Sequence, residues 1–284
     1  MNSPTTKAFL AVILCGVIAG TSGLWIKMMT SMSAASIGFF RTCVPVLFLL
    51  PFLWRREESI WRGNNKKMLL TSGINAGRMY LYLVAYIYTS IGNAVVLFYS
   101  WPIFAAILGM IYLKERVTIR QIFLLLLAFT GLIIVYSQKS FSWEDRDFIG
   151  MLAALGAALT YAITVIIYKS ESDRYHRNEL IFFQNLLGAI IFAPIFFLQF
   201  PTVEIPHIGI GILYGIVIGV IVFGLFFYGL KYLPASRASG LMYMEVVSTI
   251  IMGAIFLQES LSPSMLLGGG MIIISSFLLT QMKS

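Results

Sequence analysis

The chain has 284 residues, of which 59% are hydrophobic and only 11% are charged. A soluble domain is about half apolar and roughly a quarter charged, so this composition excludes an ordinary soluble fold. A net charge of +8 would favour nucleic acid binding in a soluble protein, but here the basic residues lie between apolar runs, as membrane orientation signals do. We therefore expect the chain to lie in a lipid bilayer and to bind no nucleic acid.

Apolar runs follow one another along the whole chain, and each is long enough to cross a bilayer, for which about 20 residues suffice. The predicted spans are 8–29, 34–54, 68–91, 93–113, 119–137, 148–169, 178–199, 207–230, 234–257 and 265–282. The first run lacks a clean cleavage site and is followed by further spans, so we interpret it as a retained helix. The fold class predicted is an all-α polytopic membrane protein with about ten transmembrane helices.

Lysine and arginine are concentrated in alternate connections between these runs. One set of connections carries the basic residues of 55–67, 114–120, 169–177 and 231–237, together with Lys7 and Lys283. The other set carries only Lys139 and Arg146, with Lys27 near a helix end. Because cytoplasmic loops carry the excess of basic residues, we predict that both termini are cytoplasmic in the inner (plasma) membrane of the cell.

Three short blocks recur between the two halves of the chain. At an offset of 143, Phe39-Phe40-Arg41 matches Phe182-Phe183-Gln184; at an offset of 144, Leu97-x-Tyr99 matches Leu241-x-Tyr243 and 112–115 matches 256–259. We therefore expect two repeats, 1–140 and 141–284, of five helices each. Because five is odd, the second repeat enters the membrane from the opposite side, which is the inverted architecture that supports alternating access.

The junctions and the ninth span carry a family resemblance. Leu-Lys-Glu-Arg-Val-Thr at 113–118, Leu-Gln-Glu-Ser-Leu-Ser at 257–262 and Tyr-Met-Glu-Val at 243–246 make the whole chain resemble the EamA family of the drug/metabolite transporter superfamily. This resemblance implies a ten-helix carrier with a central cavity lined largely by helices 3, 4, 8 and 9. Where the family has proline, this chain has Val246, so we expect a straighter ninth helix. The first half keeps Pro102 but has Trp101 in place of glutamate.

Arg78 and Arg41 are the charged residues that point to a substrate site in the first half. A charge deep in a span costs about 2.5–3.5 kcal/mol and therefore usually faces a cavity or a partner. Arg78 lies near the middle of the third span, where Asn75 and Tyr82 share its helical face; Asn75 could also simply bridge helices. Arg41 lies roughly 10 Å below the outer surface, so both a cavity position and snorkelling to the interface stay open.

In the second half, Glu245 is the acidic side chain nearest the middle of the membrane. It could bind an amine, take up a proton as a proton-coupling group, or neutralise an arginine. Tyr82, Tyr99, Trp101, Tyr161 and Tyr243 lie well inside spans, where pocket lining and ordinary helix packing are both open. The residues predicted to bind substrate are Arg78, Glu245, Arg41, Tyr82, Tyr99, Trp101, Tyr243, Asn75 and Gln184.

The sequence thus predicts a carrier of a small amphipathic metabolite, preferably an amino acid or an amine-bearing derivative, that works by alternating access. The alternative is an organic phosphate or nucleotide-linked metabolite. A membrane-embedded enzyme or a channel is disfavoured, because neither His176 nor His207 is deep in a span and no filter-like segment is evident. Cys15 and Cys43 lack metal-ligand spacing, so we expect no metal and no cofactor. A monomer and a homodimer both stay open.

Overall fold

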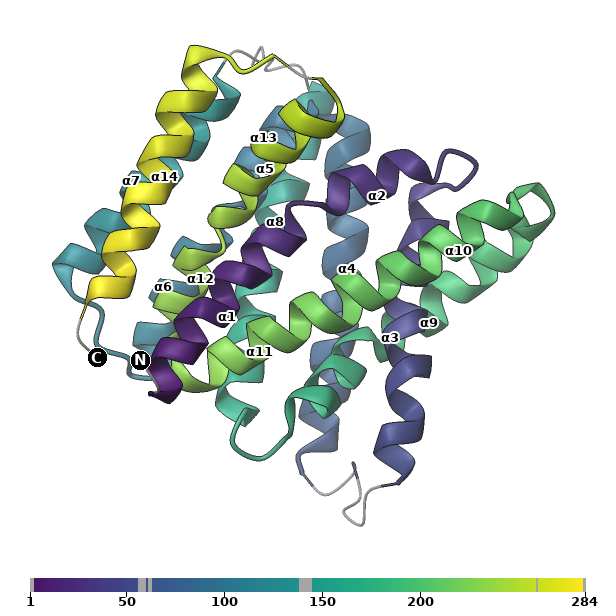
Figure 1. Cartoon of the computed structure of the whole chain (residues 1–284). Coiled ribbons are helices and arrows are strands. Elements are labelled where there is room, and N and C mark those ends of the chain that lie inside the picture. Colours follow the sequence, from purple (N-terminus) through teal and green to yellow (C-terminus); the bar gives the residue numbers. More distant parts are fainter. Residues whose placement is uncertain (1–2, 56–59, 61–62, 138–144, 259, 283–284) are drawn as a thin grey trace.

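The computed structural model describes residues 3–55, 60, 63–137, 145–258 and 260–282, and within these residues it contains helices and no strand (Figure 1). The helices of the first half are α1 (Pro4–Ala19), α2 (Ser22–Met28), α3 (Ala34–Trp54), α4 (Asn65–Tyr88), α5 (Ile91–Phe98), α6 (Trp101–Tyr112) and α7 (Ile119–Tyr136). Those of the second half are α8 (Asp145–Glu171), α9 (Arg177–Gln199), α10 (Ile205–Tyr214), α11 (Phe223–Tyr232), α12 (Ala235–Leu241), α13 (Met244–Phe256) and α14 (Pro263–Gln281).

Some of these helices follow one another without leaving the same span, so the elements form ten membrane-length runs, as the sequence predicts. In the described part of the chain, nine of them are both long enough and apolar enough to cross a membrane. The tenth, α4, has 24 residues, but its polar residues, among them Asn75 and Arg78, lower its hydropathy. The all-α polytopic fold is therefore confirmed, and α4 is the helix least suited to face lipid.

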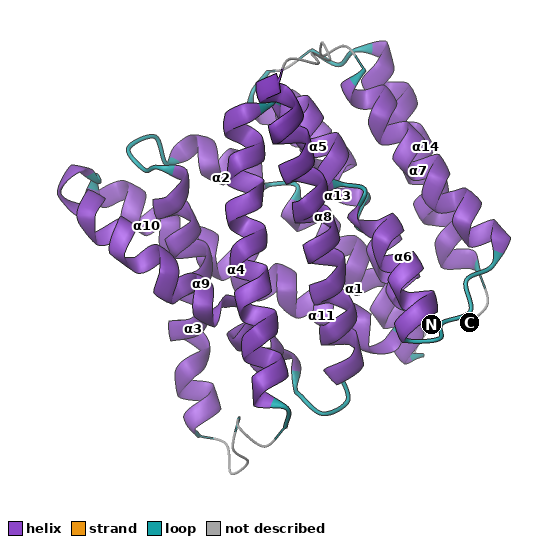
Figure 2. Ribbon diagram, turned by 180° about the vertical axis from the view of Figure 1, so that it is seen from behind, coloured by secondary structure: helices purple, strands orange, loops and turns teal. Residues whose placement is uncertain are grey.

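Close packing of helices from the two halves builds one bundle. Helix α3 packs along α9, α4 packs against α8 and α9, and α7 packs along α14 at one edge of the molecule (Figures 1 and 2). Small residues make these approaches close: a β-carbon added at Gly131 of α7 would lie 2.6 Å from the carbonyl oxygen of Gly268 of α14. Both termini lie at the same end of the bundle (Figure 1).

The fourth and ninth runs are each broken at corresponding positions. Helix α5 ends at Phe98 and α6 begins at Trp101; α12 ends at Leu241 and α13 begins at Met244. At both breaks the chain makes a tight turn with i→i+3 hydrogen bonds, such as that from the Tyr243 amide to the Gly240 carbonyl. The expectation of a straighter ninth helix is therefore wrong.

A tertiary contact explains why the ninth run turns without its proline. The Tyr243 hydroxyl donates a 2.9 Å hydrogen bond to the backbone oxygen of Tyr99, so the two breaks meet side by side. The break in the first run frees this carbonyl from the helical ladder, and a buried carbonyl needs a partner. Packing between the two breaks thus favours an interrupted helix at Tyr243, an effect that a proline has in other helices.

The eighth run contains a π-helix, η2 (Gly215–Val222), between α10 and α11. It packs against α3 beside Arg41: a β-carbon added at Gly219 would lie 3.0 Å from the Arg41 carbonyl oxygen. π-Helical turns are rare and frequently occur at functional sites. The backbone that carries Arg41 is therefore in direct contact with an irregular helix of the second half.

The junctions after α6 and α13 also correspond. Lys114 and Gln258 have φ angles of 54° and 55°, which non-glycine residues rarely adopt. The turn at Lys114 directs Glu115 to the start of α12, where its Oε1 accepts a 2.8 Å hydrogen bond from the Ala235 amide. A loop of the first half thus caps a broken helix of the second half.

Candidate functional site

Arg78 lies buried in α4, with 8% of its surface exposed, and its partners are uncharged. Its Nε donates a 3.0 Å hydrogen bond to Oδ1 of Asn75, one helical turn earlier. Its guanidinium carbon lies 4.8 Å from the centre of the Tyr161 ring and 6.0 Å from that of Phe98. Among the described residues, no carboxylate forms an ion pair with Arg78. The charge is therefore held by aromatic faces and an amide.

Arg41 reaches the same region from α3. One terminal nitrogen, Nη1, lies 3.5 Å from Oδ1 of Asn185 on α9, and the guanidinium carbon lies 4.7 Å from the Phe223 ring centre. Asn185 is held in place by its own 2.8 Å hydrogen bond to the Ile181 carbonyl. Arg41 therefore packs against α9 and α11 while its side chain stays partly exposed.

Helix α9 joins the two arginines. The Asn75 amide nitrogen donates a 2.9 Å hydrogen bond to the Gln184 carbonyl, while the neighbouring Asn185 contacts Arg41. The side-chain oxygen of Gln184 is buried, with the residue only 2% exposed, and it has no hydrogen-bond partner among the residues that the structure describes. A buried acceptor without a partner is costly, so this position favours a donor supplied from outside the chain. We name Arg41, Asn75, Arg78, Gln184 and Asn185 the arginine cluster.

Glu245 supplies negative charge near the arginine cluster. It lies in the first turn of α13, directly after the break, where the helix dipole favours a carboxylate. Its carboxyl group interacts with the Tyr99 hydroxyl and lies within electrostatic range of Arg41. No described cation lies within ion-pair distance of Glu245. Its neighbours Ser248 and Thr249 bond to backbone carbonyls: the Ser248 hydroxyl donates to Val17 of α1 at 2.6 Å, and the Thr249 hydroxyl to Glu245 at 2.9 Å.

Aromatic rings fill the space between Arg78 and the broken helices. Tyr82 packs on Phe98 with ring centres 4.6 Å apart, and Trp101 packs edge to face on Tyr161 at 4.7 Å. The Tyr99 and Tyr243 rings lie 6.3 Å apart. The structure thus brings all nine residues singled out from the sequence into one connected region.

Within that region, the residues differ in how free their polar groups are. Asn75 donates a hydrogen bond to α9 and so bridges two helices in this conformation, while Tyr243 donates one to the α5–α6 break. Sequence reasoning missed Asn185, which the adjacent Gln184 could have signalled. It also missed Phe98 and Phe223, which nothing distinguishes among the 22 phenylalanines of the chain.

Nothing in this site has the form of a metal centre. In the portions of the chain that the structure describes, no group of three or more histidine, cysteine, aspartate or glutamate side chains could hold a metal ion. The groups that the site does offer are paired guanidinium donors, a carboxylate, amide groups and aromatic faces, all of which can recognise a small molecule.

The chain is similar to known transporters over its whole length. The EamA-like transporter family matches residues 6–137 and again 148–281. An uncharacterized transporter of Archaeoglobus fulgidus is 28% identical, covering 93% of this chain and 92% of the relative. A pseudopaline exporter, CntI, of Pseudomonas aeruginosa is 25% identical over 67% of this chain and 66% of its own length. A crystal structure with 15% identity has the same fold, with a TM-score of 0.86 over 98% of this chain and 99% of the other. The protein is therefore a membrane transporter that belongs to the EamA-like transporter family.

Proposed function

We propose that this transporter carries an amino acid or an amine-bearing derivative of one. The observation that carries the proposal is the pair of interior arginines with only uncharged partners, next to an interior glutamate that likewise has no described ion-pair partner. A chain that left opposite charges unpaired inside a membrane would lose stability, unless a ligand with complementary charges binds there. A zwitterion supplies both of the missing partners.

Arg78 is the proposed carboxylate ligand. Asn75 accepts the hydrogen bond of its Nε–H, and no hydrogen bond from its terminal nitrogens is seen among the described residues, so a carboxylate can accept two parallel hydrogen bonds from the guanidinium. Arg41 assists from α3, and Gln184 accepts a hydrogen bond from a substrate N–H or O–H. Glu245 binds the ammonium group, while the rings of Tyr82, Tyr161 and Trp101 cover the apolar part.

The proposed transport cycle is alternating access between two inverted repeats, with both termini in the cytoplasm and the protein in the plasma membrane. The distribution of lysine and arginine supports this orientation, and so does the position of both termini at one end of the bundle. The matched breaks in the fourth and ninth runs support the inverted repeat, because interrupted helices at equivalent positions of two halves typically border the substrate site.

Exchange in proteoliposomes tests the proposal. Arg78→Ala should abolish or strongly reduce saturable exchange of amino acids, Arg41→Ala should reduce it less, and Arg78→Lys should restore it only in part, because lysine keeps the charge and loses the paired donors. Glu245→Gln should weaken substrates with an ammonium group far more than their deaminated analogues. Wild-type affinity in a folded Arg78→Ala protein would contradict the carboxylate assignment.

The same variant separates substrate binding from proton coupling. If Glu245 couples transport to protons, Glu245→Gln should abolish accumulation driven by a pH gradient and leave exchange intact. If it binds the amine, exchange of amine-bearing substrates falls as well. If neither activity changes, Glu245 is a structural counter-charge.

A second candidate substrate class is an organic phosphate, and one observation favours it. Arg41 and Arg78 are close enough for each charge to act on the other, so the region holds two cations beside the single carboxylate of Glu245 that the described residues supply there. A site with excess positive charge suits a substrate with more than one negative charge. In that case a phosphorylated metabolite should compete for exchange, and Glu245→Gln should leave its competition unchanged.

A further inference from the structure

Two cavities lie at the start of α9, at the end of the bundle that also holds both termini (Figure 1). The first, of about 290 Å³, lies between the end of α3 at Phe52 and Leu53 and the α9 residues Arg177 and Asn178. The second, of about 340 Å³, lies between the start of α9 and the end of α11. His176 and Arg177 line both, so the two cavities adjoin at the start of α9, and together we call them the α9 groove.

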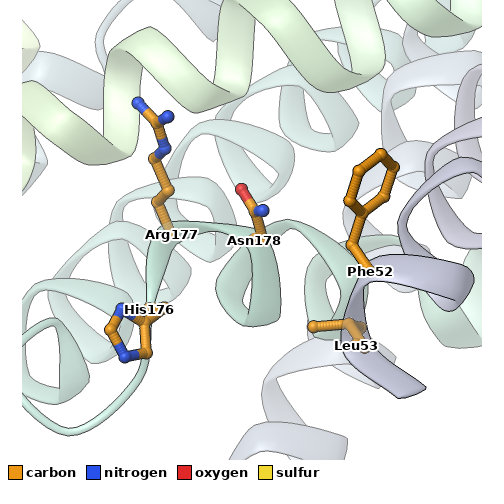
Figure 3. A pocket seen from close by; sticks show the side chains of 5 residues that line it. All are labelled: Phe52, Leu53, His176, Arg177 and Asn178. Carbon is orange, nitrogen blue, oxygen red and sulfur yellow. The ribbon is translucent and has the colours of Figure 1, made fainter. Parts of the chain in front are cut away.

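Basic side chains dominate the charge of the α9 groove. Arg177 points away from His176 and toward α11, with Asn178 between it and Phe52 (Figure 3). On the opposite wall, Lys231 near the end of α11 lines the second cavity. Arg177 and Lys231 are both exposed, and neither has an ion-pair partner among the described residues. Two cations thus border one cavity with no described counter-charge.

The helix end itself does not explain this arrangement. Glu179 already accepts a 2.7 Å hydrogen bond from the His176 amide, so a carboxylate of the chain caps the start of α9. The attraction for an anion comes instead from the side chains on both walls.

Aromatic and apolar side chains continue the groove toward the membrane. Tyr228 and Tyr232 of α11 pack with their rings tilted by 57° and their centres 5.1 Å apart, and Tyr232 is 43% exposed. On the α3 side, Phe52 is 55% exposed. Tyrosine and tryptophan collect at the level of lipid headgroups, and a basic pocket between helices on the cytoplasmic side is typical of anionic headgroup binding. The α9 groove offers the charge for a headgroup and the rings for the start of its acyl chains.

We propose that the α9 groove binds one anionic phospholipid, with its phosphate between Arg177 and Lys231 and its acyl chains along Phe52, Tyr228 and Tyr232. The proposal commits to a membrane lipid because the cations and the exposed rings lie in one groove at the end of the spans. A soluble phosphate would use the cations alone. The proposed lipid lies outside the arginine cluster and takes no part in substrate recognition.

Lipid titration of the purified full-length protein tests this proposal. In neutral detergent, phosphatidylglycerol should bind more tightly than phosphatidylcholine and raise the apparent unfolding temperature, because it binds the native state. Native mass spectrometry should count one tightly bound phosphatidylglycerol. Each cation near a membrane surface is worth about fivefold in affinity for an anionic lipid, so the double variant Arg177→Gln/Lys231→Gln should bind phosphatidylglycerol about 25-fold more weakly. Phosphatidylcholine binding should not change.

A matched double variant controls for the loss of net charge. Lys66 and Arg120 are exposed cations outside the α9 groove, so Lys66→Gln/Arg120→Gln should keep the wild-type affinity for phosphatidylglycerol. Should the groove variant fail to fold, each single variant should still show about a fivefold loss. Equal loss in the groove and control variants, or no loss in either, would overturn the proposal. Equal stabilisation by inorganic phosphate or glycerol phosphate would reassign the groove to soluble anions.

Discussion

The contact between α1 and the start of α13 holds the backbone of Glu245, and Gly20→Ala tests it. A β-carbon added at Gly20 would lie 2.6 Å from the Ser248 hydroxyl oxygen and 2.8 Å from the Glu245 carbonyl oxygen. Ser248 cannot rotate away freely, because its hydroxyl donates a 2.6 Å hydrogen bond to the Val17 carbonyl of the same helix pair. The added methyl group therefore has to push α1 and α13 apart.

The expected cost is that of overpacking, about 1–3 kcal/mol of unfolding free energy, with about 0.6–1.7 kcal/mol more if the Ser248 hydrogen bond breaks. The backbone of Gly20 has φ −61° and ψ −17°, which alanine adopts without strain. The contacts of the added methyl group therefore decide whether the unfolding free energy rises or falls. Because Glu245 moves with α13, affinity for ammonium-bearing substrates should fall more than affinity for deaminated analogues.

Gly23 provides the matched control on the adjoining helix α2. A β-carbon at Gly23 meets nothing within 4 Å, so Gly23→Ala should be neutral or gain up to about 1 kcal/mol from helix propensity. Thermal unfolding of both variants in the same detergent, together with ligand titration, measures the difference. Equal unfolding temperatures for Gly20→Ala and Gly23→Ala would refute the steric argument. They would mean that the contact with α1 does not hold Glu245 in position.

Two further predictions concern the broken helices and the orientation. Tyr243→Phe removes the donor to the Tyr99 carbonyl, so it should lower the unfolding free energy by about 0.6–1.7 kcal/mol, as measured by thermal unfolding; an unchanged value would mean that the hydrogen bond does not join the breaks. With both termini in the cytoplasm, cysteine at position 202 should react with an impermeant thiol reagent on intact cells, while cysteine at 174 should react only after permeabilisation. The reverse pattern would invert the topology.

Much of the fold follows from hydrophobic runs and their boundaries. The predicted span 34–54 coincides with α3, and the predicted span 119–137 begins with α7 and ends one residue beyond it. Both starts are marked in the sequence because Ser33 and Thr118 cap the helices, each accepting a hydrogen bond from the amide three residues on. The first span was predicted as one helix, yet it divides after Ala19 into α1 and α2. No proline marks that division, so periodicity alone could not find it.

Charge and depth in the membrane predicted the residues of the candidate site, but they did not predict how those residues are arranged. A buried arginine or glutamate is visible in a sequence because it is expensive in a membrane, and this singled out Arg78 and Glu245. That Arg78 lies over Tyr161 depends on the packing of α4 against α8, which no local pattern encodes. The break before Met244 was missed for the same reason: its partner, the Tyr99 carbonyl, lies in the other half of the chain.

The π-helix η2 has a consequence for the symmetry of the two halves. Under the proposed repeat, the register between the halves is 143 at Gln184 and 144 at Tyr243, so the second half has gained one residue between these points. A π-helical turn closes i→i+5 hydrogen bonds and thus accommodates one residue more than an α-helical turn, and η2 lies within that interval. The extra residue is absorbed beside Arg41, where the first half has the regular helix α4. The two halves are therefore unequal at the site itself, so in the proposed alternating-access cycle the inward-facing and outward-facing states would not be mirror images in the shape they offer to a substrate.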